Sequence, residues 1–293
     1  MKKAAQARAM FITAMLVFGT VGLFVRATPL PSVEIALYRA GIALGVLCLI
    51  MSFTGRFRAI PAMGTKVWLF ALSGVIMAVN WITLFEAIRF TSIALATLSY
   101  YLAPTLMVLA SVLILKERIT PFQVVCFVLS TLGLVLMLGV SGGSGDDLKG
   151  ILLALGSAVL YATVVMINKA AGEADGIART FVQFLVAVMV LVPFIVLSGG
   201  FHLGALDGQG WLNLLILGVV HTGICYSLYF TSLRHLRGQQ AAILSYLDPL
   251  VAVLLSVLWL GERVSALQLM GGGIMVLFAL LNEVAGRKTD KAA

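Results

Sequence analysis

Charged residues are scarce in this chain. Aspartate, glutamate, lysine and arginine make up 11% of its 293 residues, whereas 61% of the residues are hydrophobic. A soluble fold of this length needs a much larger polar surface, so the composition excludes an ordinary soluble domain. The net charge of +8 comes from basic residues scattered between apolar runs. That distribution is typical of membrane-topology signals, and we expect no nucleic-acid partner.

Cysteine is also sparse, and no catalytic pattern stands out. The chain has three cysteines, Cys48, Cys126 and Cys225, which lie far apart within apolar runs. This spacing predicts neither a disulfide framework nor a metal site. The sequence has no Ser-His-Asp arrangement and no HExxH segment that would point to a hydrolase. We therefore expect a protein that is not an enzyme and that needs no cofactor.

Long apolar runs account for most of the chain. Ten windows are long enough to cross a bilayer as helices, and short charged or turn-forming stretches separate them. They lie at roughly 9–27, 32–53, 67–88, 92–113, 119–139, 150–170, 180–199, 211–233, 239–260 and 265–285. The predicted fold class is an all-α membrane protein with ten transmembrane helices embedded in the lipid bilayer.

The lysines and arginines predict how these helices are oriented. If the N-terminus is inside, 15 of the 20 basic residues fall in segments on the inner side. Arg26, Arg89, Lys149 and Arg263 fall outside, and Arg39 lies within a helix. Because basic residues are enriched on the cytoplasmic side, we expect both termini in the cytoplasm. The predicted location is the bacterial inner (plasma) membrane.

One segment occurs twice, 145 residues apart. The run LSYYLAP at 98–104 returns as LSYLDP at 244–249. Pro104 precedes Glu117 by 13 residues, and Pro249 precedes Glu262 by the same 13. In a helix this spacing covers about 20 Å, most of the hydrocarbon thickness. Each copy therefore predicts a proline-kinked membrane helix with a glutamate at its far boundary, where it shapes a gate.

The repeat predicts an inverted architecture. Each half contains five predicted helices, an odd number, so the second half enters the membrane in the opposite direction. The predicted repeats are 9–140 and 150–285, around a central cavity. Inverted repeats are typical of carriers whose binding site lies between the two halves. Since duplication makes one chain a complete carrier, we expect a monomer that binds a small-molecule substrate.

A resemblance to a known family rests on three features of the sequence. They are the two Tyr-Leu-x-Pro segments, the pairs Glu117-Arg118 and Glu262-Arg263, and Arg39 in the second predicted helix. Over about residues 10–284 the chain resembles the ten-helix EamA branch of the drug/metabolite transporter superfamily. The resemblance implies export of small metabolites, often amino acids or related compounds, by alternating access. It also implies a cavity lined by helices three, four, eight and nine. Import, drug or cation efflux, and a non-transporting role remain the alternatives.

Polar and aromatic side chains inside the predicted helices are candidates for the substrate site or the cavity wall. An ionisable group in hydrocarbon costs a few kcal/mol or more, so each one needs a reason to be there. Arg39 either holds its helix to a neighbour or lines the cavity. The candidates are Asn80, Trp81, Phe85, Glu86, Tyr100, Tyr101, His221, Tyr226, Ser245, Tyr246 and Asp248.

Alternatives remain for three of these candidates. Glu86 either pairs with Arg89 on the same helix face or points inward. His221 is typical of a hydrogen-bonding packing residue, although a ligand contact is the alternative. Asp248 breaks the repeat, because its counterpart is Ala103. It either stabilises the kink before Pro249, or titrates during transport or holds a cationic group.

Overall fold

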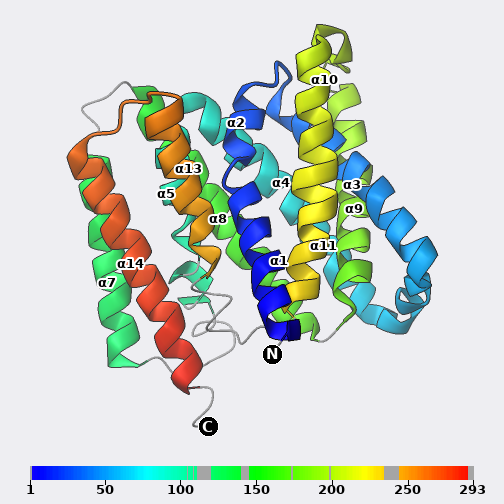
Figure 1. Ribbon diagram of the computed structural model, residues 1–293, viewed down its shortest axis with the longest axis horizontal. Coiled ribbons are helices and arrows are strands. Elements are labelled where there is room, and N and C mark those ends of the chain that lie inside the picture. The colour runs from blue at the N-terminus through cyan, green and yellow to red at the C-terminus, as the bar shows by residue number, and fades with distance from the viewer. Residues whose placement is uncertain are drawn as a thin grey trace.

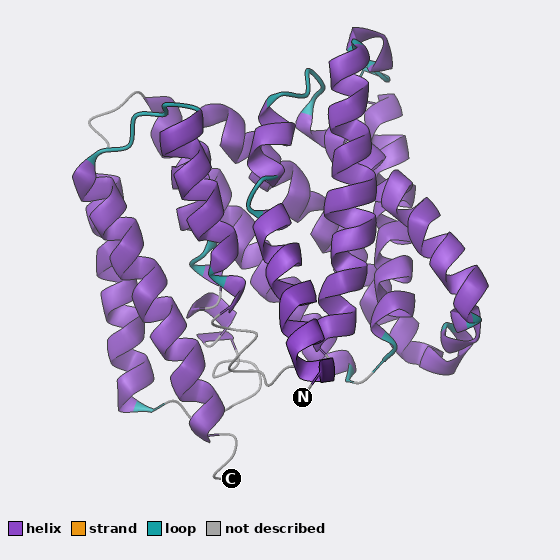
Figure 2. Ribbon diagram, viewed as in Figure 1, coloured by secondary structure: helices purple, strands orange, loops and turns teal. Residues whose placement is uncertain are grey.

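The computed structural model describes residues 2–103, 105–107, 109–110, 120–139, 145–172, 174–197, 199–233 and 244–289. Throughout these ranges the regular secondary structure is helical (Figure 2). Six helical spans are long and apolar enough to cross a membrane: Ala5–Arg26, Ser32–Thr54, Pro61–Phe90, Gly145–Asn168, Gly176–Leu197 and Gly208–Tyr229. The all-α class predicted from the composition is confirmed.

Four shorter apolar helices complete the set among the described residues. They cover Ile93–Met107, Val124–Gly133, Leu247–Trp259 and Ala266–Leu281. Together with the six long spans, these segments fall within or overlap the ten predicted windows. The inverted relation between the two five-helix halves stays a prediction.

The helices run side by side as one bundle (Figure 1). α1 and α2 lie in the middle, α7 and α14 flank one side, and α3, α9 and α10 flank the other. The start of α1 and the end of α14 lie at the same end of the bundle. The bounds are α1 Lys2–Phe18, α2 Val21–Arg26, α3 Ser32–Thr54, η1 Arg56–Ala59, η2 Pro61–Lys66, α4 Val67–Phe90, α5 Ile93–Tyr100, α7 Pro121–Gly139, α8 Gly145–Ala171, α9 Gly176–Leu197, η3 Leu203–Ala205, α10 Gly208–Leu215, η4 Ile216–Ile224, α11 Cys225–Leu233, α13 Leu247–Leu254, η5 Leu255–Trp259 and α14 Ala266–Thr289.

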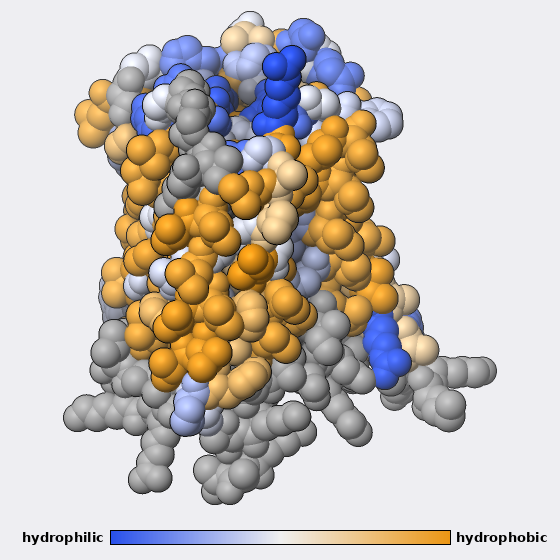
Figure 3. Space-filling model, turned by 90° about the vertical axis from the view of Figure 1, so that its left-hand side faces the viewer, coloured by the Kyte–Doolittle hydropathy of each residue, from blue (hydrophilic) through white to orange (hydrophobic). Residues whose placement is uncertain are grey.

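The outer surface of the bundle is apolar. Val128, Leu132 and Val135 on α7 are each about half exposed, as is Leu277 on α14. Figure 3 shows a broad hydrophobic area on this face, with hydrophilic residues gathered at its upper end. A lipid environment favours such a surface, and it favours helices because hydrocarbon offers no partner for a free peptide group.

Several helices are interrupted in the middle of the bundle. α1 and α2 are separated at Gly19 and Thr20, α5 ends at Tyr100, and α13 begins just before Pro249. The segment η4 is a π-helix over nine residues. The Thr20 hydroxyl donates to the carbonyl of Val17 at 2.8 Å, so a side chain satisfies one backbone group at the first break. Interrupted helices within a membrane are tolerated where they face a cavity.

Glycines allow close contacts between the two halves. A Cβ atom on Gly74 of α4 would lie 2.6 Å from the carbonyl oxygen of Gln183 on α9. A Cβ atom on Gly19 would lie 2.7 Å from the carbonyl oxygen of Asp248. Small residues are the usual means by which membrane helices approach closely. Here they bring the first half against α9 and α13 of the second.

A cluster of polar contacts surrounds Glu262 and involves the end of α2 and the start of α5. Glu262 forms an ion pair with Arg26 at the end of α2, and its Oε2 accepts from Ser256 and, at 2.9 Å, from the backbone N–H of Ile93. Arg26 also donates to the carbonyls of Ile88 and Thr91. Glu262 therefore caps the N-terminus of α5 and joins elements of both halves.

We predict that Gly74→Ala destabilises the protein by about 1–3 kcal/mol, because the new methyl group overlaps the backbone of α9. The measurement is the midpoint of thermal unfolding in detergent. Gly45→Ala is the matched control, since nothing lies within 4 Å of a Cβ atom there. Alanine also has the higher helix propensity, so the control stays unchanged or rises slightly. Equal midpoints for the two variants would contradict the close contact.

We also predict that Glu262→Ala lowers the unfolding midpoint more than Arg56→Ala does. The first change leaves both Arg26 and the N–H of Ile93 without their carboxylate, and an unsatisfied buried polar group costs about 1–3 kcal/mol. The second removes one partner of the Arg56–Asp175 pair, which is separated by 3.3 Å and contributes less than about 1 kcal/mol. A larger loss for Arg56→Ala would refute the capping role.

Candidate substrate-binding cavity

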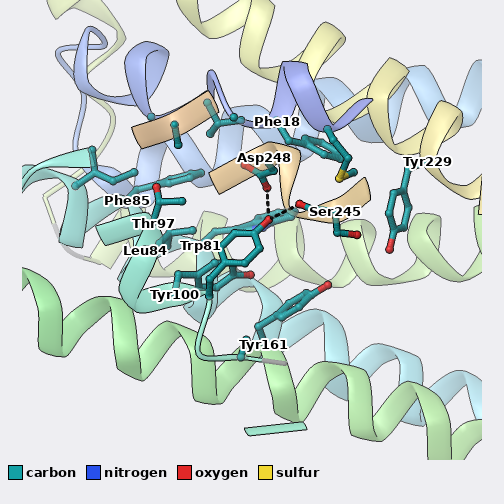
Figure 4. Close-up of a pocket in the computed structure, with 18 of the residues that line it drawn as sticks. Phe18, Trp81, Leu84, Phe85, Thr97, Tyr100, Tyr161, Tyr229, Ser245 and Asp248 are labelled. Carbon is teal, nitrogen blue, oxygen red and sulfur yellow. Dashed lines mark hydrogen bonds between the residues drawn. The ribbon is translucent and has the colours of Figure 1, made fainter. Parts of the chain in front are cut away.

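A cavity of about 510 Å³ lies where the interrupted helices meet. Residues from α1, α2, α3, α4, α5, α8, α11 and α13 line it, so both halves of the chain contribute. Its walls are largely aromatic and include Phe18, Trp81, Phe85, Tyr100, Tyr161 and Tyr229 (Figure 4). Pockets of this size, with apolar walls and a few polar groups, typically accept small molecules.

Most of the predicted site residues meet in this cavity. Trp81, Phe85, Tyr100, Tyr101, Tyr226, Ser245 and Asp248 all line it. Tyr246 does not belong to the wall, and its ring packs against Tyr101 with centroids 5.8 Å apart. Tyr101 and Tyr246 occupy equivalent positions in the repeat, 145 residues apart. Tyr101 lines the cavity, whereas Tyr246 packs against it from outside the wall.

Three further predicted residues, Asn80, Glu86 and His221, do not line the cavity, and the expectation that they do is corrected. The side-chain amide of Asn80 donates to Ser157 on α8, at 2.7 Å to both its carbonyl and its hydroxyl. Glu86 accepts a bond of 2.6 Å from Ser32, while Arg89 donates to the carbonyl of Leu30. No Glu86–Arg89 ion pair forms in this described part of α4. These polar groups join neighbouring helices to one another.

His221 also acts between helices. Its Nε2 lies 2.8 Å from the hydroxyl of Thr20, and its ring centroid lies 5.0 Å from that of Phe24. The Nδ1 atom lies 3.2 Å from the carbonyl of Ile216 within η4. The imidazole therefore supports the break between α1 and α2, as the packing alternative for this residue anticipates.

Of the four gate candidates, the structure describes two. Pro104 and Glu117 lie outside the described residues. Pro249 is buried in the first turn of α13, where a missing backbone N–H costs least, and Glu262 lies in the polar cluster with Arg26 and Ile93. Neither described residue lines the cavity.

Among the described residues that line the cavity, Asp248 is the acidic one. Its Oδ2 accepts a hydrogen bond of 2.9 Å from the hydroxyl of Tyr101, which also lies 3.2 Å from the carbonyl of Ser245. Figure 4 shows the carboxylate beside these partners, above the rings of Trp81 and Tyr100. No basic side chain of the described residues lies within ion-pair distance of it. The carboxylate is thus held in place by one hydroxyl and faces the cavity.

Arg39 is the basic group of the wall, and both roles considered for it occur together. Its Nε donates to the hydroxyl of Thr222 at 2.6 Å, which holds α3 to η4. The guanidinium carbon lies 4.9 Å from the centroid of Trp81 and 5.4 Å from that of Phe85. Cation–π contacts of this kind stabilise a cation that has left water. Across the described ranges, no carboxylate lies within 4 Å of the guanidinium.

Some wall residues were not among the sequence candidates. Phe18, Thr97 and Tyr161 all line the cavity. Phe18 and Tyr161 are 143 residues apart, close to the 145-residue offset of the repeated segment, so the duplication gave a signal for this aromatic pair. Thr97 lies in the alanine-rich entry to α5 and had no comparable signal. In the described part of the chain, no group of three or more His, Cys, Asp or Glu side chains is placed to hold a metal ion.

Comparison with known proteins identifies the family. The model of the EamA-like transporter family matches residues 7–139 and again 148–283. The uncharacterized transporter YxxF of Bacillus subtilis is 30% identical over 287 residues, which cover 96% of this chain and 90% of that protein. The threonine/homoserine exporter RhtA of Escherichia coli is 28% identical over 173 residues, 58% of each chain.

A solved crystal structure shares the fold. It superposes with a TM-score of 0.65 at 21% identity and covers 97% of this chain and 99% of its own. The family match spans most of the sequence, and the apolar helices are those of a multi-pass membrane protein. The resemblance drawn from the doubled motif is thereby confirmed, and this protein belongs to the EamA-like transporter family.

Proposed function

We propose that this protein is a carrier that exports a small metabolite across the bacterial inner membrane by alternating access. The observation that carries the proposal is the central cavity of about 510 Å³, which both halves of the chain line at the breaks in their helices. A site between two halves is reached from either side when one half rocks against the other. A carrier of this kind needs no cofactor and no second chain.

Amino acids or similar compounds are the proposed substrates. The cavity has the volume of a small-molecule site, and its aromatic walls suit the apolar part of such a compound. The relative RhtA, which is named as a threonine/homoserine exporter, supports this class and the outward direction. Both halves of one chain line the cavity, and on this basis we propose that the monomer transports.

The proposed cycle needs a gate at each end of the cavity. The Glu262 cluster is our candidate for one gate, because Glu262 joins α2, α5 and η5 through charged contacts that can break and re-form. The positive-inside count supports assigning this end to the outer side and both termini to the cytoplasm. Opening would then separate Arg26 from Glu262.

The proposal predicts that filling the cavity abolishes transport without unfolding the protein. Thr97 lines the cavity, so Thr97→Phe places a ring where the substrate would pass. The measurement is counterflow in proteoliposomes loaded with a mixed pool of amino acids, nucleosides and simple amines. We expect at least one labelled compound to accumulate with the unaltered protein, and at least about tenfold slower uptake with Thr97→Phe.

Thr131→Phe is the matched control, because Thr131 is exposed on the lipid-facing side of α7. This variant is expected to keep the unaltered uptake rate. Equal uptake by both variants would remove the cavity from the transport path. No uptake of any compound by a sample with a cooperative unfolding transition would argue against the carrier itself. A flux that follows only an inward gradient would replace export by import.

A further inference from the structure

We infer that the cavity binds a dipolar ligand in one orientation, with its carboxylate on Arg39 and its ammonium group on Asp248. The inference rests on the proposed function, and adds to it the ligand's charges and the residues that recognise them. It comes from two opposite charges that line the same cavity, each without an ionic partner among the described side chains.

The guanidinium of Arg39 is oriented but not neutralised. Its side chain is buried, with 5% of its surface exposed, and its one hydrogen bond to a described residue uses Nε. Thr222 and the rings of Trp81 and Phe85 hold the group in position. The two terminal nitrogens remain for a ligand, and a planar guanidinium matches a carboxylate with two parallel hydrogen bonds.

The carboxylate of Asp248 is in the complementary situation. Tyr101 donates to Oδ2, whereas Oδ1 has no protein donor within the described ranges. The donor is a neutral hydroxyl, so the negative charge stays uncompensated. An ammonium group brings up to three N–H donors and the missing positive charge. Asp248 is therefore suited to a primary amine that enters from the cavity.

The two charges belong to different halves of the chain. Arg39 lies on α3 and Asp248 on α13. Arg39 corresponds to Phe184 at the offset of 145 residues and to Val182 at the offset of 143, and Asp248 corresponds to Ala103, so neither charge has a charged equivalent at these offsets. The site is therefore asymmetric although the scaffold is repeated. A ligand that touches both charges connects the two halves and has one favoured direction.

A ligand with any other charge pattern leaves at least one charge of the cavity unpaired, which is unfavourable in free energy. A simple amine neutralises Asp248 but adds a second cation to a cavity that already holds Arg39. A simple carboxylate neutralises Arg39 and faces the carboxylate of Asp248. An uncharged ligand displaces water from both groups and compensates neither. Since an unpaired charge away from water is expensive, a dipolar molecule is the class that satisfies both groups.

The test compares three matched ligand series on the purified full-length protein in detergent. The probes are L-threonine, L-leucine and L-phenylalanine, each with the amine that lacks its carboxylate and the acid that lacks its amino group. Affinity is measured by calorimetry, and the shift in unfolding temperature gives a second readout. We expect at least one amino acid to bind about tenfold or more tightly than both of its derivatives, as loss of a charged hydrogen bond implies.

Two variants assign the groups. Arg39→Gln should lower amino-acid affinity about tenfold and make the amino acid bind no better than its amine. Asp248→Asn should also lower amino-acid affinity, and it should make the amino acid bind no better than its acid. Arg39→Lys retains the cation and is expected to keep part of the preference over the amine. Glu86→Gln removes a carboxylate behind the wall and is the control that leaves every affinity unchanged.

Several outcomes would overturn the inference. The inference would be overturned if, in all three series, the amine or the acid bound as tightly as its parent amino acid, or if none of the three amino acids bound. An equal loss for all three ligand types in both variants would show that the two residues only support the fold. The unaltered protein decides the preference even where a variant fails to fold.

The same measurements separate this inference from the proposed carrier function. Counterflow of a singly charged or uncharged compound, together with no amino-acid binding, keeps the carrier and rejects the dipolar site. Selective amino-acid binding without any flux keeps the site and rejects transport. The two proposals therefore fail on different results.

Discussion

The structure depends on the need to satisfy every backbone polar group inside hydrocarbon. That constraint makes the described secondary structure helical, and it restricts where a helix can be interrupted. The breaks cluster around the cavity, and side chains bond to the carbonyls there. Thr20 donates to Val17 beside the first break, and Thr222 donates to Leu217 within η4 at 2.7 Å. The cavity and the helix breaks are thus two aspects of one arrangement.

Close packing of η4 against α3 positions the basic side of the cavity. A Cβ atom on Gly218 would lie 2.5 Å from the Cβ of Ile42, and one on Gly223 would lie 2.8 Å from Val46. Both glycines face α3, where Ile42 and Val46 lie about one and two turns beyond Arg39. This approach brings the hydroxyl of Thr222 within reach of Arg39 and keeps the guanidinium beside Trp81. Small residues outside the cavity wall therefore help to position a charged group within it.

The helices were predictable from the sequence, but their rotation was not. In α4, Trp81 and Phe85 are four residues apart and share the face that lines the cavity. Asn80 and Glu86 are each one residue outside that pair, so they point about 100° away, toward α8 and Ser32. A helix that is apolar nearly all round carries no periodic signal to distinguish these faces. The sequence therefore identified α4 as a cavity helix, but it did not show which of its polar residues line the cavity.

The sequence by itself determined the fold class, the apolar spans, the repeated proline-to-glutamate spacing and the family, because composition and spacing along one chain carry that information. Tertiary structure alone decided which polar groups line the same cavity. Arg39 and Asp248 are 209 positions apart in the sequence, yet both line one cavity. Helix rotation and glycine contacts place them there, and both depend on neighbours that are distant in the chain.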